Sequence, residues 1–376
     1  MNFIQEYEEL KSCFNLKGDS IPIGNSKLVI RNFDFTSKNS YPECQYNEED
    51  TNIPENYNFR YPVIFPEHRY KTSRAIILLH GLNERTWHKH LTGAKFLASK
   101  TGKAVILFPL SFHINRGLPD WMDVRKMSVP LEQRKAKYPG IKDATVVNLA
   151  LSERLTDHPE RFLFSGFQSA MDLVSLMKQI DAGNHPLFGK GTTVDLFAYS
   201  ISCMLLQTLM ISNPGNVLKN SRIVLFAGGS LFSYIRGISR FIMDSVAFET
   251  LRQFYVGHSV TLGRPSKEID PLLDHNFGRS FSALLTSDGL KKKREKALNE
   301  FSDNLMIIGL KADRIMPSDG IKAAFGEKLS REKFTLLDFP YPYSHENPFP
   351  VISNKFGKQV EDAFLSVFRP TLSFLS

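Results

Sequence analysis

Cysteine is scarce in this sequence, which has three among its 376 residues: Cys13, Cys44 and Cys203. Three cysteines do not make a disulfide framework, and no pair has the C-x-x-C spacing of zinc sites and redox motifs. We therefore expect neither structural disulfides nor a metal site. Cys203 falls within a helical pattern, where a small buried apolar residue is a better interpretation than a reactive thiol.

Long apolar runs are missing as well. No uninterrupted apolar stretch approaches the ~18 residues that a transmembrane helix needs. The first ten residues, MNFIQEYEEL, carry acids where a secretory signal would carry basic residues followed by an apolar run. The sequence therefore predicts a reduced, cytoplasmic setting without a membrane partner.

Positively charged residues outnumber negatively charged ones, but they are spread along the sequence. The formal net charge is +8, which in other chains indicates nucleic acid or anionic membranes as partners. Here the basic residues are scattered, and the densest run is Lys291 to Arg294. A solvated helix face explains such a run better than a binding patch does. We expect no nucleic-acid partner.

What the sequence does contain is a series of short, continuous apolar runs. Because they do not alternate with polar residues, they are typical of strands buried on both faces. They lie at residues 75–80, 104–109, 194–200, 222–229, 305–310 and 334–339. Helical patterns at 89–100, 171–180 and 202–211 lie between them. This alternation predicts the α/β class, with a doubly wound, mostly parallel sheet and a helical cap insertion.

The domain boundaries follow from where this pattern begins and is interrupted. Residues 1–70 are polar and turn-rich, with one alternating run at 27–35, and predict an N-terminal extension with edge strands. Residues 71–229 and 304–376 form the predicted core. The connections at 110–165 and 230–303 are too long for simple crossovers. We interpret residues 230–303 as a cap over the carboxyl edge of the sheet.

The sharpest motif is the junction between the run at 194–200 and the helical pattern that follows. Ser200 stands at the turn, with the small residues Ala198 and Ser202 two positions to either side. This arrangement is typical of a nucleophile elbow, in which a serine sits in a strained strand-to-helix turn that leaves no room for larger neighbours. An ordinary turn with Ser200 as a helix N-cap is the alternative.

An acid and a histidine follow Ser200 in the chain order that this type of site requires. Asp313 comes just after the run at 305–310, and His345 comes after the run at 334–339. In the predicted roles, Ser200 is the nucleophile, His345 the general base, and Asp313 the residue that orients the imidazole. Asp338 is the alternative acid, although it falls within the last strand.

The loop after the run at 75–80 completes the candidate site. His80 and Gly81 are followed by Leu82, whose backbone N–H is the first predicted oxyanion donor. The second is the N–H of Ile201, directly after the nucleophile. Gly81 would let the backbone approach closely. A plain strand-to-helix turn is the alternative for this loop.

These motifs together resemble the α/β-hydrolase superfamily. The resemblance covers residues 70–376 and is carried by the HG pair at 80–81, the AYSIS elbow, the acid in KADRIMP and the late His345. The stretches HGLNERTW, AVILFPLSFHINR and Leu118 to Trp121 resemble a bacterial α/β-hydrolase-like family of unassigned function. The superfamily implies hydrolysis of an ester, thioester, amide or related bond, without implying a substrate.

Three further features have plain interpretations. His88 and His90 form an H-x-H pair without a carboxylate at metal-ligand spacing, which indicates a surface helix face. Ser165 lacks a preceding buried strand and indicates a helix start. The Asp-His pair at residues 274–275 lies within the expected cap, and contact with substrate is an alternative role for it.

We therefore expect a serine hydrolase that acts on a small-molecule acyl substrate without a metal or organic cofactor. Acyl transfer uses the same residues and stays open. The alternative class is a binding or regulatory protein with impaired catalysis, which Ala198 and Ser202 favour because glycine is usual at both positions. Apolar residues of the cap favour an apolar substrate: Leu231, Phe232, Phe241, Phe248 and Phe254.

Overall fold

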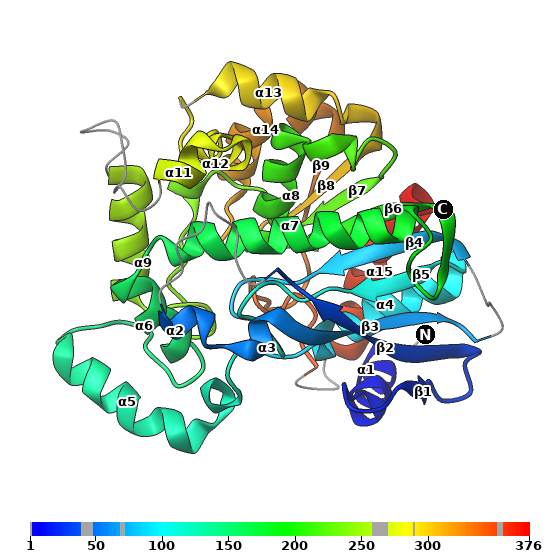
Figure 1. Ribbon diagram of the computed structural model, residues 1–376, viewed down its shortest axis with the longest axis horizontal. Coiled ribbons are helices and arrows are strands. Elements are labelled where there is room, and N and C mark those ends of the chain that lie inside the picture. Colours follow the sequence, from blue (N-terminus) through cyan, green and yellow to red (C-terminus); the bar gives the residue numbers. More distant parts are fainter. Residues whose placement is uncertain (1, 39–47, 68–71, 258–269, 289, 352–355) are drawn as a thin grey trace.

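The computed structural model describes residues 2–38, 48–67, 72–257, 270–288, 290–351 and 356–376. Cys44 and residues 258–269 of the expected cap lie outside these ranges. The described chain forms a nine-stranded sheet with helices on both faces (Figure 1). Its strands are β1 (Ser20–Pro22), β2 (Leu28–Thr36), β3 (Asn58–Pro66), β4 (Thr72–Leu79), β5 (Ala104–Leu107), β6 (Phe188–Tyr199), β7 (Ile223–Phe226), β8 (Leu305–Leu310) and β9 (Phe334–Leu337).

The sheet is antiparallel at one edge and parallel elsewhere. Its order is β1-β2-β3-β5-β4-β6-β7-β8-β9. The pairs β1–β2, β2–β3 and β3–β5 are antiparallel, and the pairs from β5 to β9 are parallel. The predicted α/β class with a doubly wound, mostly parallel sheet is confirmed, and each of the six apolar runs overlaps a strand. Residues 1–70 supply the antiparallel edge.

Burial on both faces explains why these strands are continuously apolar. Along β6, the side chains of Val194, Leu196 and Ala198 belong to one core cluster, whereas Phe197 and Tyr199 belong to the other. Successive side chains of a strand point to opposite faces, so a sheet that is covered twice needs an apolar residue at every position. Ser200, the next residue, lies beyond the strand end.

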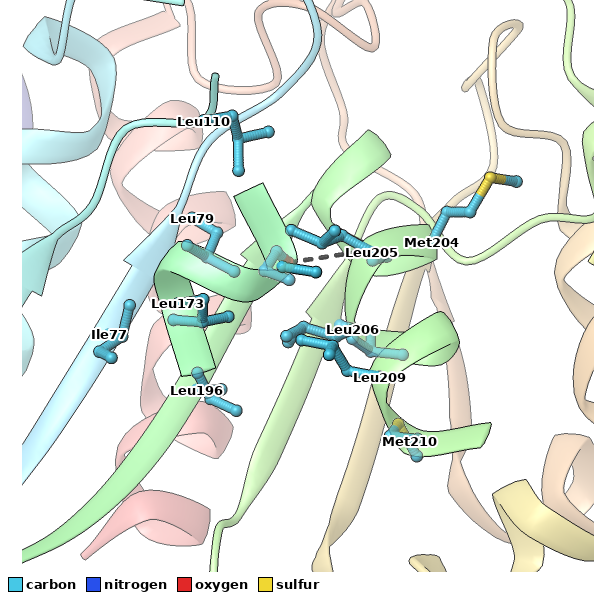
Figure 2. Packing of buried hydrophobic residues seen from close by; sticks show 14 of the residues in the cluster. Ile77, Leu79, Leu110, Leu173, Leu196, Met204, Leu205, Leu206, Leu209 and Met210 are labelled. Carbon is cyan, nitrogen blue, oxygen red and sulfur yellow. Dashed lines mark hydrogen bonds between the residues drawn. The ribbon is translucent and has the colours of Figure 1, made fainter. Parts of the chain in front are cut away.

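Each face is covered by three long helices. The first is covered by α7 (Arg161–Asp181), α8 (Ile201–Ser212) and α14 (Ser318–Lys333), and the second by α1 (Phe3–Cys13), α4 (His88–Thr101) and α15 (Gly357–Leu375). Figure 2 shows Leu173 of α7 and Leu206 and Leu209 of α8 among strand residues of the first core. Residues 202–211 of α8 are all buried, which fixes this helix firmly behind Ser200.

The two long connections pack against each other. Residues 110–165 contain α5 (Val124–Lys137) and α6 (Leu149–Asp157), and residues 230–303 contain α9 (Ser245–Arg252), α11 (Asp270–Asp274), α12 (Asn276–Ser282) and α13 (Lys291–Asn299). Arg134 of α5 forms a buried ion pair with Asp244, the N-cap of α9, with an Nε–Oδ2 distance of 2.7 Å. The shorter segments are α2 (Glu48–Thr51), α3 (Pro54–Tyr57), η1 (Pro119–Met122), η2 (Pro214–Asn216), η3 (Phe232–Tyr234), η4 (Gln253–Gly257) and η5 (Ser302–Asn304).

Two sequence predictions are wrong because each rested on local pattern alone. Ser165 does not start a helix: α7 begins at Arg161, whose guanidinium is held by Asp50 with an Nε–Oδ2 distance of 2.6 Å. Arg294 is not part of a solvated face. Residues 291–293 are exposed, but Arg294 is fully buried and donates to the carbonyl oxygens of Ala283 and Ala324, which ties α13 to α14.

Another buried arginine, Arg116, anchors the loop after β5. Arg116 is fully buried and forms an ion pair with Asp172 of α7, with an Nη2–Oδ2 distance of 2.8 Å. The guanidinium also donates to the carbonyl oxygens of Asn56 and Pro109, and Asp172 accepts a hydrogen bond from Ser37 at 2.7 Å. Three segments that are distant in sequence are thereby held at one point.

Asp172→Ala should lower the free energy of unfolding by about 3–5 kcal/mol, because it leaves the Arg116 charge buried without its carboxylate. Urea denaturation measures the change. Asp181→Ala, at an exposed position of the same helix, serves as the control and should change stability by less than about 0.5 kcal/mol. Equal effects of the two substitutions would show that the buried pair does not stabilise the fold.

Candidate active site

The backbone at Ser200 adopts a conformation that non-glycine residues rarely take. Its φ is 60° and its ψ is −122°, directly between the last residue of β6 and the first of α8. Backbone strain of this kind costs about 1–3 kcal/mol, so the surrounding structure must impose it. Part of that constraint is a hydrogen bond from the Ser200 N–H to the carbonyl oxygen of Phe226, at 3.1 Å.

Small residues surround this strained turn. A Cβ added to Gly228 would lie 2.3 Å from the Ser200 carbonyl oxygen, and one added to Gly81 would lie 3.2 Å from the Ser200 Cβ. Ala198 is fully buried, and Ser202 donates a short hydrogen bond from its Oγ to the carbonyl oxygen of His80. The elbow therefore accommodates Ala198 and Ser202 where glycine is usual, and Ser202 connects it to the neighbouring loop that contains His80 and Gly81.

A continuous chain of hydrogen bonds joins the three residues that the sequence singled out. Ser200 Oγ lies 2.7 Å from His345 Nε2, and His345 Nδ1 lies 2.7 Å from Asp313 Oδ2. All three side chains are buried, with at most 5% of each residue exposed. The other carboxylate oxygen, Oδ1 of Asp313, accepts hydrogen bonds from the N–H groups of Ile315 and Met316 at 2.9 and 2.8 Å.

The alternative acid lies elsewhere. Asp338 is exposed and forms an ion pair with Lys311 at 3.1 Å. It also accepts a hydrogen bond from Tyr343 at 3.1 Å. The hydrogen bonds from Lys311 and Tyr343 lower the pKa of this carboxyl. Among the described contacts, the carboxylate that meets His345 is that of Asp313.

The two residues predicted to supply the oxyanion donors lie beside the elbow. Leu82 and Ile201 both line an apolar cavity of about 60 Å³, and Leu82 also lines the cavity in which Ser200 is found. Within the described part of the chain, neither backbone N–H has a protein acceptor. His80 Nε2 accepts from the Leu110 N–H at 3.0 Å, and its Nδ1 contacts the Gly81 carbonyl oxygen at 2.8 Å, which fixes this loop.

Tyr199, Lys89 and Glu84 form a cluster beside the histidine that sequence patterns did not reveal. The Tyr199 hydroxyl donates a short hydrogen bond to the His345 carbonyl oxygen, and the two rings are stacked with centroids 5.7 Å apart. The Lys89 ammonium lies 4.5 Å from the Tyr199 ring centroid, donates to the Glu346 carbonyl oxygen at 2.9 Å and forms a close ion pair with Glu84. These contacts hold the His345 loop against α4.

Electrostatics keep this cluster in defined charge states. Burial works against ionisation of Glu84, yet the neighbouring Lys89 and His90 outweigh it and lower the pKa of the carboxyl to about 2. Burial raises the pKa of the Tyr199 hydroxyl, so that it remains a hydrogen-bond donor. All three residues stand in or beside motifs that the sequence analysis quoted, but no motif indicated that they contact one another.

Other candidate residues have different environments. His90 is buried and lies 3.6 Å from Glu84, so the predicted surface position of the H-x-H pair is wrong for this residue; His88 is half-buried. His275 accepts the Phe277 N–H as the N-cap of α12, and Asp274 is exposed. Neither lines the described cavity at Ser200. Cys203 is fully buried, and burial raises the pKa of its thiol.

The described residues hold no cluster of three or more His, Cys, Asp or Glu side chains with the arrangement of a metal site. No described helix combines the length and apolar character needed to cross a bilayer.

The apolar residues expected to shape a pocket divide into two groups. Phe241 lines the cavity at Ser200, whereas Leu231, Phe232 and Phe248 are buried in the first core cluster and the partly buried Phe254 packs against it.

A comparison with known protein families finds a match over the whole given sequence. The model of a family of unknown function (DUF6051) matches residues 1–376. The chain belongs to this family. A comparison of the DUF6051 chain with curated protein sequences finds no match.

Solved structures show distant similarity to the DUF6051 chain. Pyrococcus horikoshii acylaminoacyl peptidase has 10% identity and a TM-score of 0.44, covering 93% of this chain and 41% of its own. A putative dipeptidyl aminopeptidase IV from Bacteroides ovatus has 12% sequence identity and a TM-score of 0.45, and the match covers 92% of this chain and 36% of the aminopeptidase. Esterase B from Lactobacillus rhamnosis has 14% sequence identity and a TM-score of 0.42, and the match covers 99% of this chain and 90% of the esterase. The chain thus spans about two fifths of the length of the two peptidases. Similarity at this level does not identify an activity, so the assignment must come from the site.

Stability should fall as the pH drops from about 6.5 to about 4. Burial lowers the pKa of His113 and of His185 to about 4, so below pH 6.5 the unfolded chain binds more protons than the folded chain. Each residue then costs up to about 1.4 kcal/mol per pH unit. Urea denaturation at pH 7 and pH 5 measures the difference, and His185→Asn should reduce it. An unchanged pH dependence in this variant would exclude the contribution.

Ser202→Gly tests whether serine at this position weakens the elbow. The substitution removes the hydrogen bond to His80 and introduces glycine into the first turn of α8, so we expect a loss of about 1–2 kcal/mol in unfolding free energy. The environment of Ser200 should otherwise be retained. Denaturation measures the loss, and a more stable variant would contradict the stabilising role of Ser202.

Proposed function

We propose that this protein is a serine hydrolase that cleaves a carboxylic ester or a related acyl bond. The observation that carries the proposal is the unbroken hydrogen-bond chain from Ser200 through His345 to Asp313, beginning at a residue held in strained backbone geometry. Strain of this kind is found where structure serves chemistry rather than stability. An N-cap serine does not need it.

The proposed reaction begins at Ser200. Its Oγ attacks the carbonyl carbon of the substrate while His345 Nε2 accepts the hydroxyl proton. Asp313, fixed by two backbone N–H groups, holds the imidazole in the tautomer that carries its proton on Nδ1 and stabilises the imidazolium. The C–O bond to the leaving group then breaks, His345 returns the proton to it, and an acyl-enzyme remains. Water attacks this ester in the same way and frees Ser200.

The oxyanion that forms during attack would be stabilised by the N–H groups of Leu82 and Ile201. Both donors belong to backbone that is fixed before substrate binds, because the Ile201 N–H begins α8 and the Leu82 loop is held by His80. Preorganised donors of this type contribute about 3–4 kcal/mol each to transition-state stabilisation. Acyl transfer to an alcohol would use the same groups and differ only in the acceptor.

The second candidate is a binding or regulatory protein with impaired catalysis. The residues that favoured it, Ala198 and Ser202, are accommodated in the elbow, one fully buried and the other hydrogen-bonded to His80. Nothing about binding requires the hydrogen-bond chain through His345. We keep a cytoplasmic setting, a small-molecule acyl substrate and a cap at residues 230–303 as parts of the proposal.

A fluorophosphonate probe tests the nucleophile directly. Wild-type protein should be labelled at Ser200, as mapped by mass spectrometry, and Ser200→Ala should not be labelled. Asp313→Asn should slow labelling by about 10⁴-fold, because the amide cannot hold the required imidazole tautomer. Asp338→Asn is the matched control and should react like wild type. Folded wild-type protein that remains unlabelled would favour the binding-protein candidate.

A further inference from the structure

Two cavities meet at the elbow, and they differ in chemistry. The cavity of about 60 Å³ is lined mainly by apolar side chains, among them Phe162, Met204 and Phe281, together with the two oxyanion donors. The other cavity, of about 280 Å³, contains Ser200 and His345. The lining residue that the two have in common is Leu82.

The proposed chemistry assigns the two halves of a substrate to these cavities. His345 donates a proton to the leaving group, so the leaving group must lie on the side of the imidazole. That side is the 280 Å³ cavity, because His345 lines it and does not line the apolar one. The acyl chain then occupies the apolar cavity beyond Leu82 and Ile201.

Four charged side chains line the cavity on the leaving-group side: Glu84, Arg85, Lys89 and Glu346. Glu84 and Lys89 neutralise each other in a close ion pair. The carboxylate of Glu346 accepts a short hydrogen bond from Ser239. Arg85 differs from the others, because within the described residues its guanidinium has no hydrogen bond, ion pair or ring contact.

Arg85 is also half-buried rather than extended into solvent. It lines the Ser200 cavity and an adjoining one of about 50 Å³ that reaches Trp121 and Arg154. Burial lowers the pKa of its guanidinium, and no carboxylate in the described part of the chain counteracts that effect. A partly desolvated guanidinium that lacks a partner is suited to a planar anion, which it can bind through two parallel hydrogen bonds.

The geometry points to Arg85 as a specificity-determining residue that binds an anionic group, a carboxylate or a phosphate, on the leaving-group side of the substrate. This inference rests on the proposed hydrolase function, because that function tells the two cavities apart. The substrate class is then an apolar acyl group joined to an anionic alcohol, thiol or amine. A merely solvated arginine would give no charge selectivity.

The test uses butyrate esters that differ only in the leaving group. The leaving-group phenols are 4-hydroxybenzoate, 4-hydroxyphenyl phosphate and, as the neutral reference, methyl 4-hydroxybenzoate. Wild-type protein should have a higher kcat/KM for at least one anionic ester than for the neutral one. Arg85→Gln should reduce kcat/KM for that ester by about 10- to 100-fold, mainly through KM, and change the neutral ester less than about threefold. The two anionic esters show whether carboxylate or phosphate is preferred.

Arg125→Gln, at an exposed position of α5, is the matched control and should retain the wild-type selectivity. Equal loss for charged and neutral esters in Arg85→Gln would overturn the inference, as would a wild-type protein without charge preference. Fluorophosphonate labelling of Ser200 should proceed at the wild-type rate in Arg85→Gln, since the residue does not take part in the attack.

Failure of the hydrolase proposal gives a different result. If Ser200 is not labelled, titration calorimetry with 4-hydroxybenzoate and 4-hydroxyphenyl phosphate still tests the anion site. Binding of either anion to wild-type protein, and its loss in Arg85→Gln, would support an anion site without hydrolysis. Equal binding by wild type and variant would exclude Arg85 from anion binding.

Discussion

Crowding around the backbone of Ser200 is the constraint on which the site depends. The turn from β6 into α8 is so tight that the Ser200 carbonyl leaves no space for a side chain at Gly228. The hydrogen bond from the Ser200 N–H to β7 and the buried length of α8 hold this conformation on both sides. The energy stored in one residue is thus offset by packing over the whole centre of the sheet, and the Oγ is directed toward His345.

Much of the architecture could be predicted from residues 75–80, 194–200 and the other apolar runs, because burial on two faces leaves a continuous local signal. Ser200, Asp313 and His345 were also accessible from sequence, since each follows a strand and the carboxyl ends of parallel strands meet at one edge. The contacts around Lys89 and Glu84 were not, because an ion pair between a helix and the loop before it does not reveal the tyrosine and carbonyl that it meets. Arg294 was misinterpreted for the same reason: its partners are carbonyl groups, which are present at every residue.

The candidate site combines a rigid side and a polar side. His80, Ser202 and the buried face of α8 fix the backbone that carries the predicted oxyanion donors. On the other side, Lys89 binds Glu84, the Tyr199 ring and the loop that carries His345. A fixed backbone is what a developing oxyanion requires, because donors that must reorganise contribute less. The polar side offers charge for recognition without disturbing that backbone.

The hydrogen bond between Ser200 and His345 joins residues that are 145 positions apart in the chain. Closing a loop of this length costs conformational entropy, which contacts across the sheet must offset. The two groups are brought together by β7, β8 and β9, which lie in parallel beside β6. A nascent chain that ends before residue 345 contains Ser200 but not His345, so the hydrogen bond between them cannot form until the loop after β9 has been synthesised.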